Sequence, residues 1–317
     1  MRIRKIPKGH GRFRTIYVPS VKEKERLRKL LPVLHELHAQ AVDRHGTRGI
    51  AHAFVPNRNP VTCALPHRGF QVTVSCDLEN WFDTVREDQL VAAGVPPEVA
   101  KAITIDGVCR QGLPTSPVAA NIAAVAFDAR LLKSLKGFTA MYCFLDFAYT
   151  RYADDITISF SFTDGLVHPD STYADILVRL ISNRVEEFGW TIAEHKTHIQ
   201  HAKAGRRIIV GIAVDDRVQQ TRKTRRKLRA AEHQSNSVQK CHTVTSRTKA
   251  LNAANGLREW AACKLPRKAR STRQMMGVVA GSSSSPSPPG DRSSLTAVPG
   301  STRRILIEKI ADGSPNQ

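Results

Sequence analysis

A ten-residue segment, RYADDITISF at positions 151–160, sets two adjacent aspartates between two runs of strand-forming residues. Aspartate favours turns, whereas the β-branched and aromatic residues beside it favour strands. The segment is therefore predicted to be a β-hairpin with Asp154 and Asp155 at its turn. Two neighbouring carboxylates repel each other unless a cation or water lies between them, so this turn is a candidate for a functional site.

A second strand is predicted over 71–76 (QVTVSC), and it runs directly into Asp77. If this strand pairs beside the hairpin, three carboxylates converge at one place. Hard cations such as Mg²⁺ prefer oxygen ligands, and two such ions about 4 Å apart can support phosphoryl transfer. Asp77, Asp154 and Asp155 are therefore predicted to hold Mg²⁺, with Mn²⁺ as a possible substitute.

The charge of the chain indicates the kind of partner. Among 317 residues, 48 lysines and arginines face 28 acids, which gives a net charge of +20. Such an excess points to a polyanion, and nucleic acid is the polyanion that suits a metal-dependent phosphoryl transfer site. The 41% hydrophobic content is enough for a folded core.

The cysteines and the apolar segments of the sequence indicate where in the cell the protein is expected. The six cysteines are scattered without a CxxC pair, which is typical of reduced thiols in a cytoplasmic protein. No apolar segment follows the basic start, and no run is long enough to span a bilayer, so we expect neither secretion nor a membrane partner.

The order of predicted elements favours an α+β fold, an antiparallel sheet packed on helices. The best-specified helix covers 116–137, with Ser116 as its cap and Gly137 at its end. The other predictions are helices over 21–44 (interrupted near Pro32), 86–93 and 171–188, and strands over 14–19 and 207–214.

Several motifs resemble those of reverse transcriptases. Tyr152-Ala153-Asp154-Asp155 resembles the YxDD box, and 77–82 (DLENWF) resembles the first catalytic motif. Residues 111–117 (QGLPTSP), with Asn121, are similar to the QGxPTSPxxxN motif, and 189–197 (GWTIAEHKT) to the lysine motif that follows. Residues 5–19 resemble the basic fingers motif. These matches occur in the order of the family and span about 5 to 214.

The resemblance implies a right-hand polymerase and a role for each matched residue. Asp77, Asp154 and Asp155 would be catalytic and bind metal, and Lys196 would protonate the leaving pyrophosphate. Phe82 would exclude a 2′-hydroxyl, so that deoxynucleotides are used, and Gln111 and Gly112 would let the backbone approach the nucleotide. The remaining residues implied to bind substrate are Arg14, Leu78, Pro114 and Tyr152.

The same resemblance suggests a division of the chain. We expect fingers over 1–70 and a palm over 71–214, with part of the fingers inserted near 86–110. A basic helical thumb would follow over 215–277, and a disordered Ser/Pro/Gly-rich tail over 278–317. The thumb would follow the backbone of an RNA–DNA hybrid.

The motifs are most similar to those of bacterial enzymes of the retron, abortive-infection and other defence-associated groups. Residues 63–67 read CAxxH where retron enzymes have NAxxH, and Ile209-Val210-Gly211 replaces their VTG. The expected function is RNA-directed DNA synthesis from dNTPs on a dedicated non-coding RNA, with an effector protein as a further expected partner. The alternatives are a group II intron-type enzyme, an RNA-dependent RNA polymerase, and a non-catalytic RNA-binding scaffold.

Overall fold

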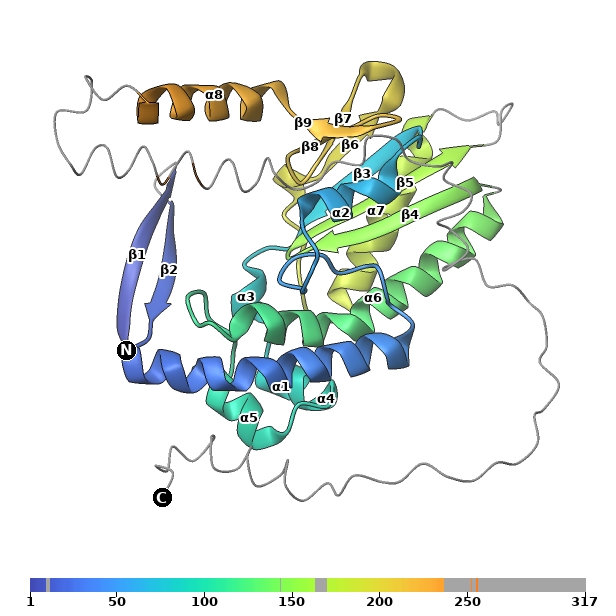
Figure 1. The fold of residues 1–317 in the computed structure, drawn as a ribbon. Coiled ribbons are helices and arrows are strands. Elements are labelled where there is room, and N and C mark those ends of the chain that lie inside the picture. The colour runs from blue at the N-terminus through green and yellow to red at the C-terminus, as the bar shows by residue number, and fades with distance from the viewer. Residues whose placement is uncertain (10–11, 143, 163–169, 237–251, 253–254, 256–317) are drawn as a thin grey trace, which may run out of the picture. The chain divides into compact units, whose positions relative to one another are not determined.

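The structure is a computed structural model that describes residues 1–9, 12–142, 144–162, 170–236, 252 and 255 (Figure 1). Its described residues form two compact units. One comprises Met1–Ala41 and Phe82–Ala123, and the other comprises Val42–Trp81 and the described part of 124–269. The segment predicted as an insertion near 86–110 thus groups with the N-terminal residues, whereas 42–70, predicted as fingers, group with the strands that contain Asp77 and Asp155.

The first unit contains a two-stranded hairpin and mostly helical segments. Strands β1 and β2 pair antiparallel, with Ile3 opposite Tyr17 and Ile6 opposite Arg14. The elements that lie in it wholly or in part are β1 (Arg2–Gly9), β2 (Arg12–Val18), α1 (Val21–His45), α3 (Trp81–Thr84), α4 (Glu87–Ala92), α5 (Pro97–Ile103) and α6 (Ser116–Met141).

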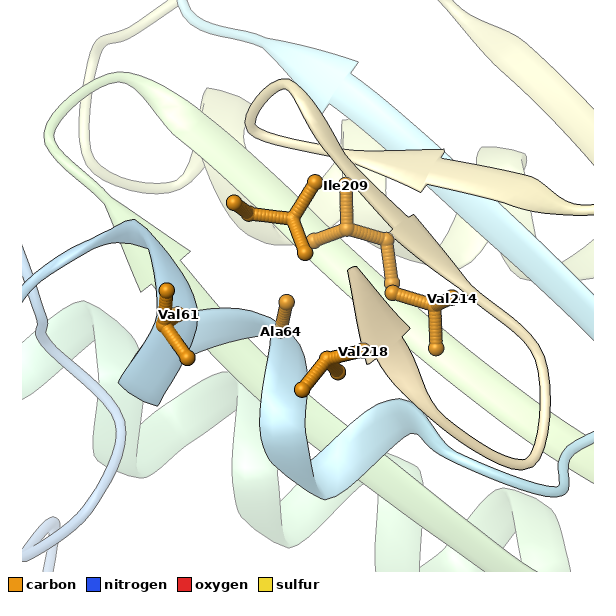
Figure 2. Close-up of a cluster of buried hydrophobic side chains, with 6 residues drawn as sticks. Val61, Ala64, Ile209, Val214 and Val218 are labelled. Atoms are coloured by element: carbon orange, nitrogen blue, oxygen red, sulfur yellow. The ribbon is translucent and has the colours of Figure 1, made fainter. Parts of the chain in front are cut away.

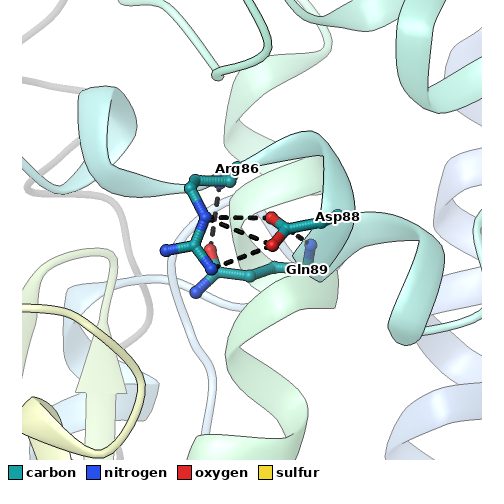
Figure 3. A network of polar contacts seen from close by, with 3 residues as sticks. All are labelled: Arg86, Asp88 and Gln89. Atoms are coloured by element: carbon teal, nitrogen blue, oxygen red, sulfur yellow. Dashed lines mark hydrogen bonds and ion pairs between the residues drawn. The ribbon is translucent and has the colours of Figure 1, made fainter.

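Helix α4 shows how one short element of this unit begins (Figure 3). The side-chain oxygen of Gln89 accepts a hydrogen bond from the backbone NH of Arg86 at 3.0 Å, which satisfies a donor at the helix start. The Arg86 guanidinium also pairs with Asp88 at 3.0 Å. Both charged side chains are exposed, so the cap rather than the ion pair contributes to stability.

The second unit is built on a four-stranded antiparallel sheet in the order β4-β5-β3-β6 (Figure 1). The strands are β3 (Val72–Asp77), β4 (Phe144–Tyr152), β5 (Asp155–Phe162) and β6 (His198–His201). Helix α7 (Asp170–Glu186) packs against β3, and Gly189 follows the helix in a left-handed conformation, as the sequence predicts for its end. The predicted α+β class is confirmed.

A three-stranded sheet and a short helix complete the unit. The strands β7 (Arg207–Ile209), β8 (Ile212–Val214) and β9 (Val218–Gln220) pack on α2 (Pro60–Ala64). Figure 2 shows the apolar cluster that joins them, formed by Val61, Ala64, Ile209, Ile212, Val214 and Val218. The remaining elements are η1 (Leu65–His67), η2 (Glu194–Lys196), η3 (Ala202–Ala204) and α8 (Arg222–Asn236).

Four local predictions are wrong. Helix α1 continues through Pro32, and α6 continues past Gly137 to Met141. Ser116 is the first helical residue rather than the cap, and its hydroxyl donates to the carbonyl of Arg110 at 2.7 Å. The run 207–214 is a hairpin rather than one strand, because Val210 and Gly211 both have positive φ and reverse the chain.

The basic region predicted as helical begins with β9 and then α8. The rest of the predicted thumb, 237–277 apart from residues 252 and 255, and the predicted tail over 278–317 lie outside the described residues.

Candidate active site

The predicted aspartate hairpin is present, with its turn shifted by one residue. Tyr152 ends β4, Ala153 and Asp154 form the turn, and Asp155 begins β5. Ala153 is buried and has a φ of +58°, which is left-handed and costs an alanine about 1–2 kcal/mol. The surrounding contacts must therefore hold this turn in place.

Asp77 lies directly opposite Asp155 in the antiparallel pair of β3 and β5. Residues opposite each other in such a pair have Cα atoms about 5 Å apart and side chains on the same face of the sheet. The backbone NH of Leu78 also donates to the carbonyl of Asp154 at 3.0 Å. The sheet register therefore brings the three aspartates together at one end of β3 and β5.

The electrostatics of the site reflect this proximity. Burial, together with the charges of Asp154 and Asp77, raises the pKa of Asp155 to about 6, against the opposing effect of Lys196. A carboxyl group whose pKa is raised by two other carboxylates marks a concentration of negative charge.

Lys196 balances part of this charge. Its Nζ lies 2.5 Å from Oδ1 of Asp77 and donates a hydrogen bond to it. The lysine is placed by the backbone, because the NH of Ala193 donates to the carbonyl of Asp77 at 2.8 Å and the NH of Glu79 to that of Thr191 at 2.8 Å. The lysine motif is thus hydrogen-bonded to the chain on both sides of Leu78.

Buried aromatic residues support the same loop. Trp190 is 2% exposed and packs edge-on against Phe127 of α6, with ring centroids 5.4 Å apart. Phe188 contacts both rings. Such packing fixes the loop that carries Lys196 onto the body of the unit.

The three carboxylates have the chemistry that a hard divalent cation requires. Among the residues that the structure describes, no group of three His, Cys, Asp or Glu side chains is already arranged as a metal site. The ammonium of Lys196 instead neutralises Asp77. A cation would thus be held by Asp77, Asp154 and Asp155 in competition with this lysine.

The predicted residues of the other unit meet around β2. The NH of Tyr17 donates to the carbonyl of Gln111 at 2.8 Å, and Arg14 lies exposed on the same strand. Gly112 has a φ of +107°, and a Cβ there would lie 2.2 Å from the carbonyl oxygen of Tyr17. The close approach that Gly112 permits is therefore to the hairpin backbone, a contact the sequence did not reveal.

The other predicted substrate residues differ in exposure. Leu78 is 1% exposed, so its side chain belongs to the core and presents no surface to a substrate. Tyr152, opposite Asp155, is half-buried, as are Phe82 in α3 and Pro114 before α6. Their predicted contacts with substrate stay predictions.

A family model described as reverse transcriptase (RNA-dependent DNA polymerase) matches residues 6–239. This chain belongs to the reverse transcriptase family. The match includes the aspartates, Lys196 and the residues around β2. The retron Mx65 reverse transcriptase of Myxococcus xanthus is 29% identical over 255 residues, which cover 72% of this chain and 54% of the relative.

Two other reverse transcriptases are similar. The retron Mx162 enzyme of Myxococcus xanthus is 30% identical over 240 residues, covering 66% of this chain and 46% of the relative. The retron Ec86 enzyme of Escherichia coli is 24% identical over 230 residues, which cover 70% of this chain and 65% of the relative. The chain spans about half the length of the two Myxococcus relatives. The expected resemblance to bacterial retron reverse transcriptases is confirmed.

Solved structures agree at the level of the fold. Apo telomerase from Candida tropicalis superposes with a TM-score of 0.53 at 14% identity, covering 81% of this reverse transcriptase and 51% of that chain. Telomerase from Candida albicans with a fragment of telomeric RNA superposes with a TM-score of 0.50 at 14% identity, covering 81% of this chain and 53% of that chain. None of the helices that the structure describes is long and apolar enough to cross a membrane.

Proposed function

We propose that this chain is an RNA-directed DNA polymerase that adds deoxynucleotides to a primer on an RNA template. The observation that carries the proposal is the pairing of Asp77 with Asp155 beside the Asp154 turn, in a chain of the reverse transcriptase family. Divalent cations held by these carboxylates would activate the attacking oxygen and stabilise the leaving one.

The reaction assigns a task to each group. The primer 3′-hydroxyl would lose its proton to solvent water and attack the α-phosphorus of the dNTP, so that a new P–O bond forms and the bond to pyrophosphate breaks. Lys196, whose Nζ donates a hydrogen bond to Asp77, would give its proton to the leaving pyrophosphate. Arg14 on β2 would bind the triphosphate through its planar guanidinium.

The nucleic-acid partner is proposed from charge. Helix α8 presents exposed basic side chains: Arg222, Lys223, Arg225, Arg226, Lys227 and Arg229. Such a helix binds phosphates without reading sequence, and its affinity falls as salt rises. The similarity to retron enzymes supports a dedicated structured RNA as template, in a retron or defence system, with an RNA–DNA hybrid as product.

The test uses the purified protein with Mg²⁺, a primed RNA template and labelled nucleotides. We expect incorporation of dNTPs, and loss of incorporation when Asp154 and Asp155 are both changed to alanine. RNA binding by that variant should persist, because it depends on the basic surface. Incorporation of rNTPs but not dNTPs would instead indicate an RNA polymerase, and activity in the double variant would place the catalytic site elsewhere.

A further inference from the structure

Arg151, the residue before Tyr152 in β4, has a fully buried guanidinium. A buried charge is costly unless it is paired and hydrogen-bonded. Nε and Nη2 of Arg151 donate to the two carboxylate oxygens of Asp128 at 2.9 and 2.8 Å. Asp128 lies on α6 and is itself 1% exposed, so the two charges neutralise each other inside the protein.

The third nitrogen of this guanidinium reaches the turn before Asp154. Nη1 of Arg151 donates to the carbonyl oxygen of Ala153 at 3.0 Å. Ala153 is the left-handed residue directly before Asp154. The hydrogen bond is thus made to the peptide group that joins Ala153 to Asp154. The orientation of this peptide group sets the direction in which the Asp154 side chain leaves the backbone.

Two aromatic residues complete the surroundings. The guanidinium carbon of Arg151 lies 5.2 Å from the ring centroid of Trp81, which is four residues beyond Asp77. The hydroxyl of Tyr149 donates to Oδ1 of Asp128 at 2.7 Å. The four residues Trp81, Asp128, Tyr149 and Arg151 all belong to one compact unit.

We propose that Arg151, held by Asp128, is a positioning residue that keeps the Ala153–Asp154 turn in its left-handed conformation and so orients the Asp154 carboxylate. This inference rests on the proposed polymerase function. A catalytic group that moves by about 1 Å can lose about 100-fold in rate. The planar guanidinium of Arg151 donates the three hydrogen bonds described above. A lysine would keep the positive charge but could not donate in these three fixed directions.

The test is Arg151→Lys, with Arg207→Lys as the matched control. Arg207 is also a buried guanidinium, 1% exposed, and it donates to Thr73 at 3.0 Å and to the carbonyl of His67 at 2.9 Å. Within the part of the chain that the structure describes, Arg207 makes no hydrogen bond to the Ala153–Asp154 turn. We expect both variants to unfold at lower temperature, whereas only Arg151→Lys loses about 100-fold in kcat at a temperature where both are folded by circular dichroism.

Two further readouts separate positioning from general destabilisation. Mn²⁺ binding, measured by electron paramagnetic resonance without nucleotide, should weaken in Arg151→Lys and not in Arg207→Lys. Adding Ala153→Gly to Arg151→Lys should recover part of the lost kcat, because glycine adopts the left-handed conformation without the strain of alanine.

Equal kcat and equal Mn²⁺ binding in the two lysine variants would overturn the inference. A wild-type protein that fails to incorporate dNTPs would refute the proposed function instead, and the Mn²⁺ measurement would still test the positioning of Asp154.

Discussion

Nζ of Lys196 lies 2.5 Å from Oδ1 of Asp77, although 119 positions separate the two residues in the sequence. The contact depends on the hydrogen bond from Ala193 to the carbonyl of Asp77, which sets the lysine loop beside the end of β3. The ammonium group thus neutralises a proposed metal ligand, and in the proposed reaction the same group would deliver a proton.

The first prediction concerns this lysine. Lys196→Gln should lower kcat by about 100-fold or more, the usual effect of losing a general acid. It should also lower the Mg²⁺ concentration that gives half-maximal activity, because the ammonium no longer competes for Asp77. Single-nucleotide incorporation at varied Mg²⁺ measures both. Lys203→Gln, an exposed lysine in η3, is the control and should change neither quantity.

The second prediction concerns Asp155, whose pKa is about 6 in the folded protein. Since its pKa is raised, the folded state binds more protons than the unfolded state between about pH 4 and 6, and this carboxyl destabilises the fold once it ionises. Asp155→Asn should therefore raise the free energy of unfolding by about 1–3 kcal/mol at pH 7.5 without divalent cations. At pH 4 the gain should be absent.

Chemical denaturation of the two proteins at both pH values measures this difference. Mg²⁺ should reduce the gain at pH 7.5, because it binds more tightly to, and so stabilises more, the protein that keeps all three carboxylates. A gain of equal size at both pH values would contradict the electrostatic explanation.

The third prediction concerns His67 in the CAxxH segment. Its ring is fully buried and contacts Ser159 at 2.8 Å and Thr150 at 2.7 Å, and burial lowers its pKa to about 3. Below about pH 6.5 the unfolded state takes up a proton that the folded state does not, so stability falls by about 1.4 kcal/mol per pH unit until about pH 3. His67→Gln should remove that share of the slope, as measured by urea unfolding from pH 4.5 to 7.5.

The fourth prediction concerns Gly112. Gly112→Ala places a Cβ 2.2 Å from the carbonyl oxygen of Tyr17, so β2 must separate from the Gln111–Gly112 turn. We expect a lower melting temperature and a higher KM for dNTP. Gly137→Ala is the matched control, because that helical glycine has nothing within 4 Å of the added Cβ. It should stabilise the protein by about 0.5–1 kcal/mol.

The fifth prediction concerns nucleotide choice. If Phe82 contacts the sugar, Phe82→Ala should raise rNTP incorporation relative to dNTP incorporation while the melting temperature changes modestly. Competition between the two nucleotides on one primed template measures the ratio. An unchanged ratio would show that Phe82 is only a half-buried packing residue.

The elements with strong local signals could be predicted from the sequence. The strand before Asp77 and the aspartate hairpin contain strand formers bounded by turn residues. The strand lies within one position of its predicted bounds and the hairpin ends two positions after its predicted end, whereas its first strand begins at Phe144, seven residues before the predicted start. Their pairing places Asp77 opposite Asp155, as expected if the strand pairs beside the hairpin.

The wrong predictions arose where packing outweighs local preference. Proline in a helix costs about 3 kcal/mol, yet α1 continues through Pro32 because Leu27, Leu30 and Leu34 beside it are all buried. Helix α6 passes Gly137 because Leu135 and Phe138 are buried on either side of it. Neither continuation can be predicted without knowing which face of each helix is buried in the fold.

The polar core could not be predicted for a related reason. Asp128 occurs in an apolar stretch of α6, which is the one signal that the sequence offers for a buried ion pair. Its partner Arg151 reads as an ordinary strand arginine until β4 is placed against that helix. The contact between Arg151 and Asp128 follows only from the three-dimensional arrangement.

Strand β3 is an interior strand, with β5 on one side and β6 on the other, and Asp77 is its last residue. Side chains alternate strictly along a strand, so deleting any one residue before Asp77 within β3 would turn this carboxylate to the opposite side of the sheet unless the whole strand slides. The strand therefore tolerates exchange of one apolar residue for another far better than any change in its length. Insertions meant to tag or split this protein belong in segments outside it.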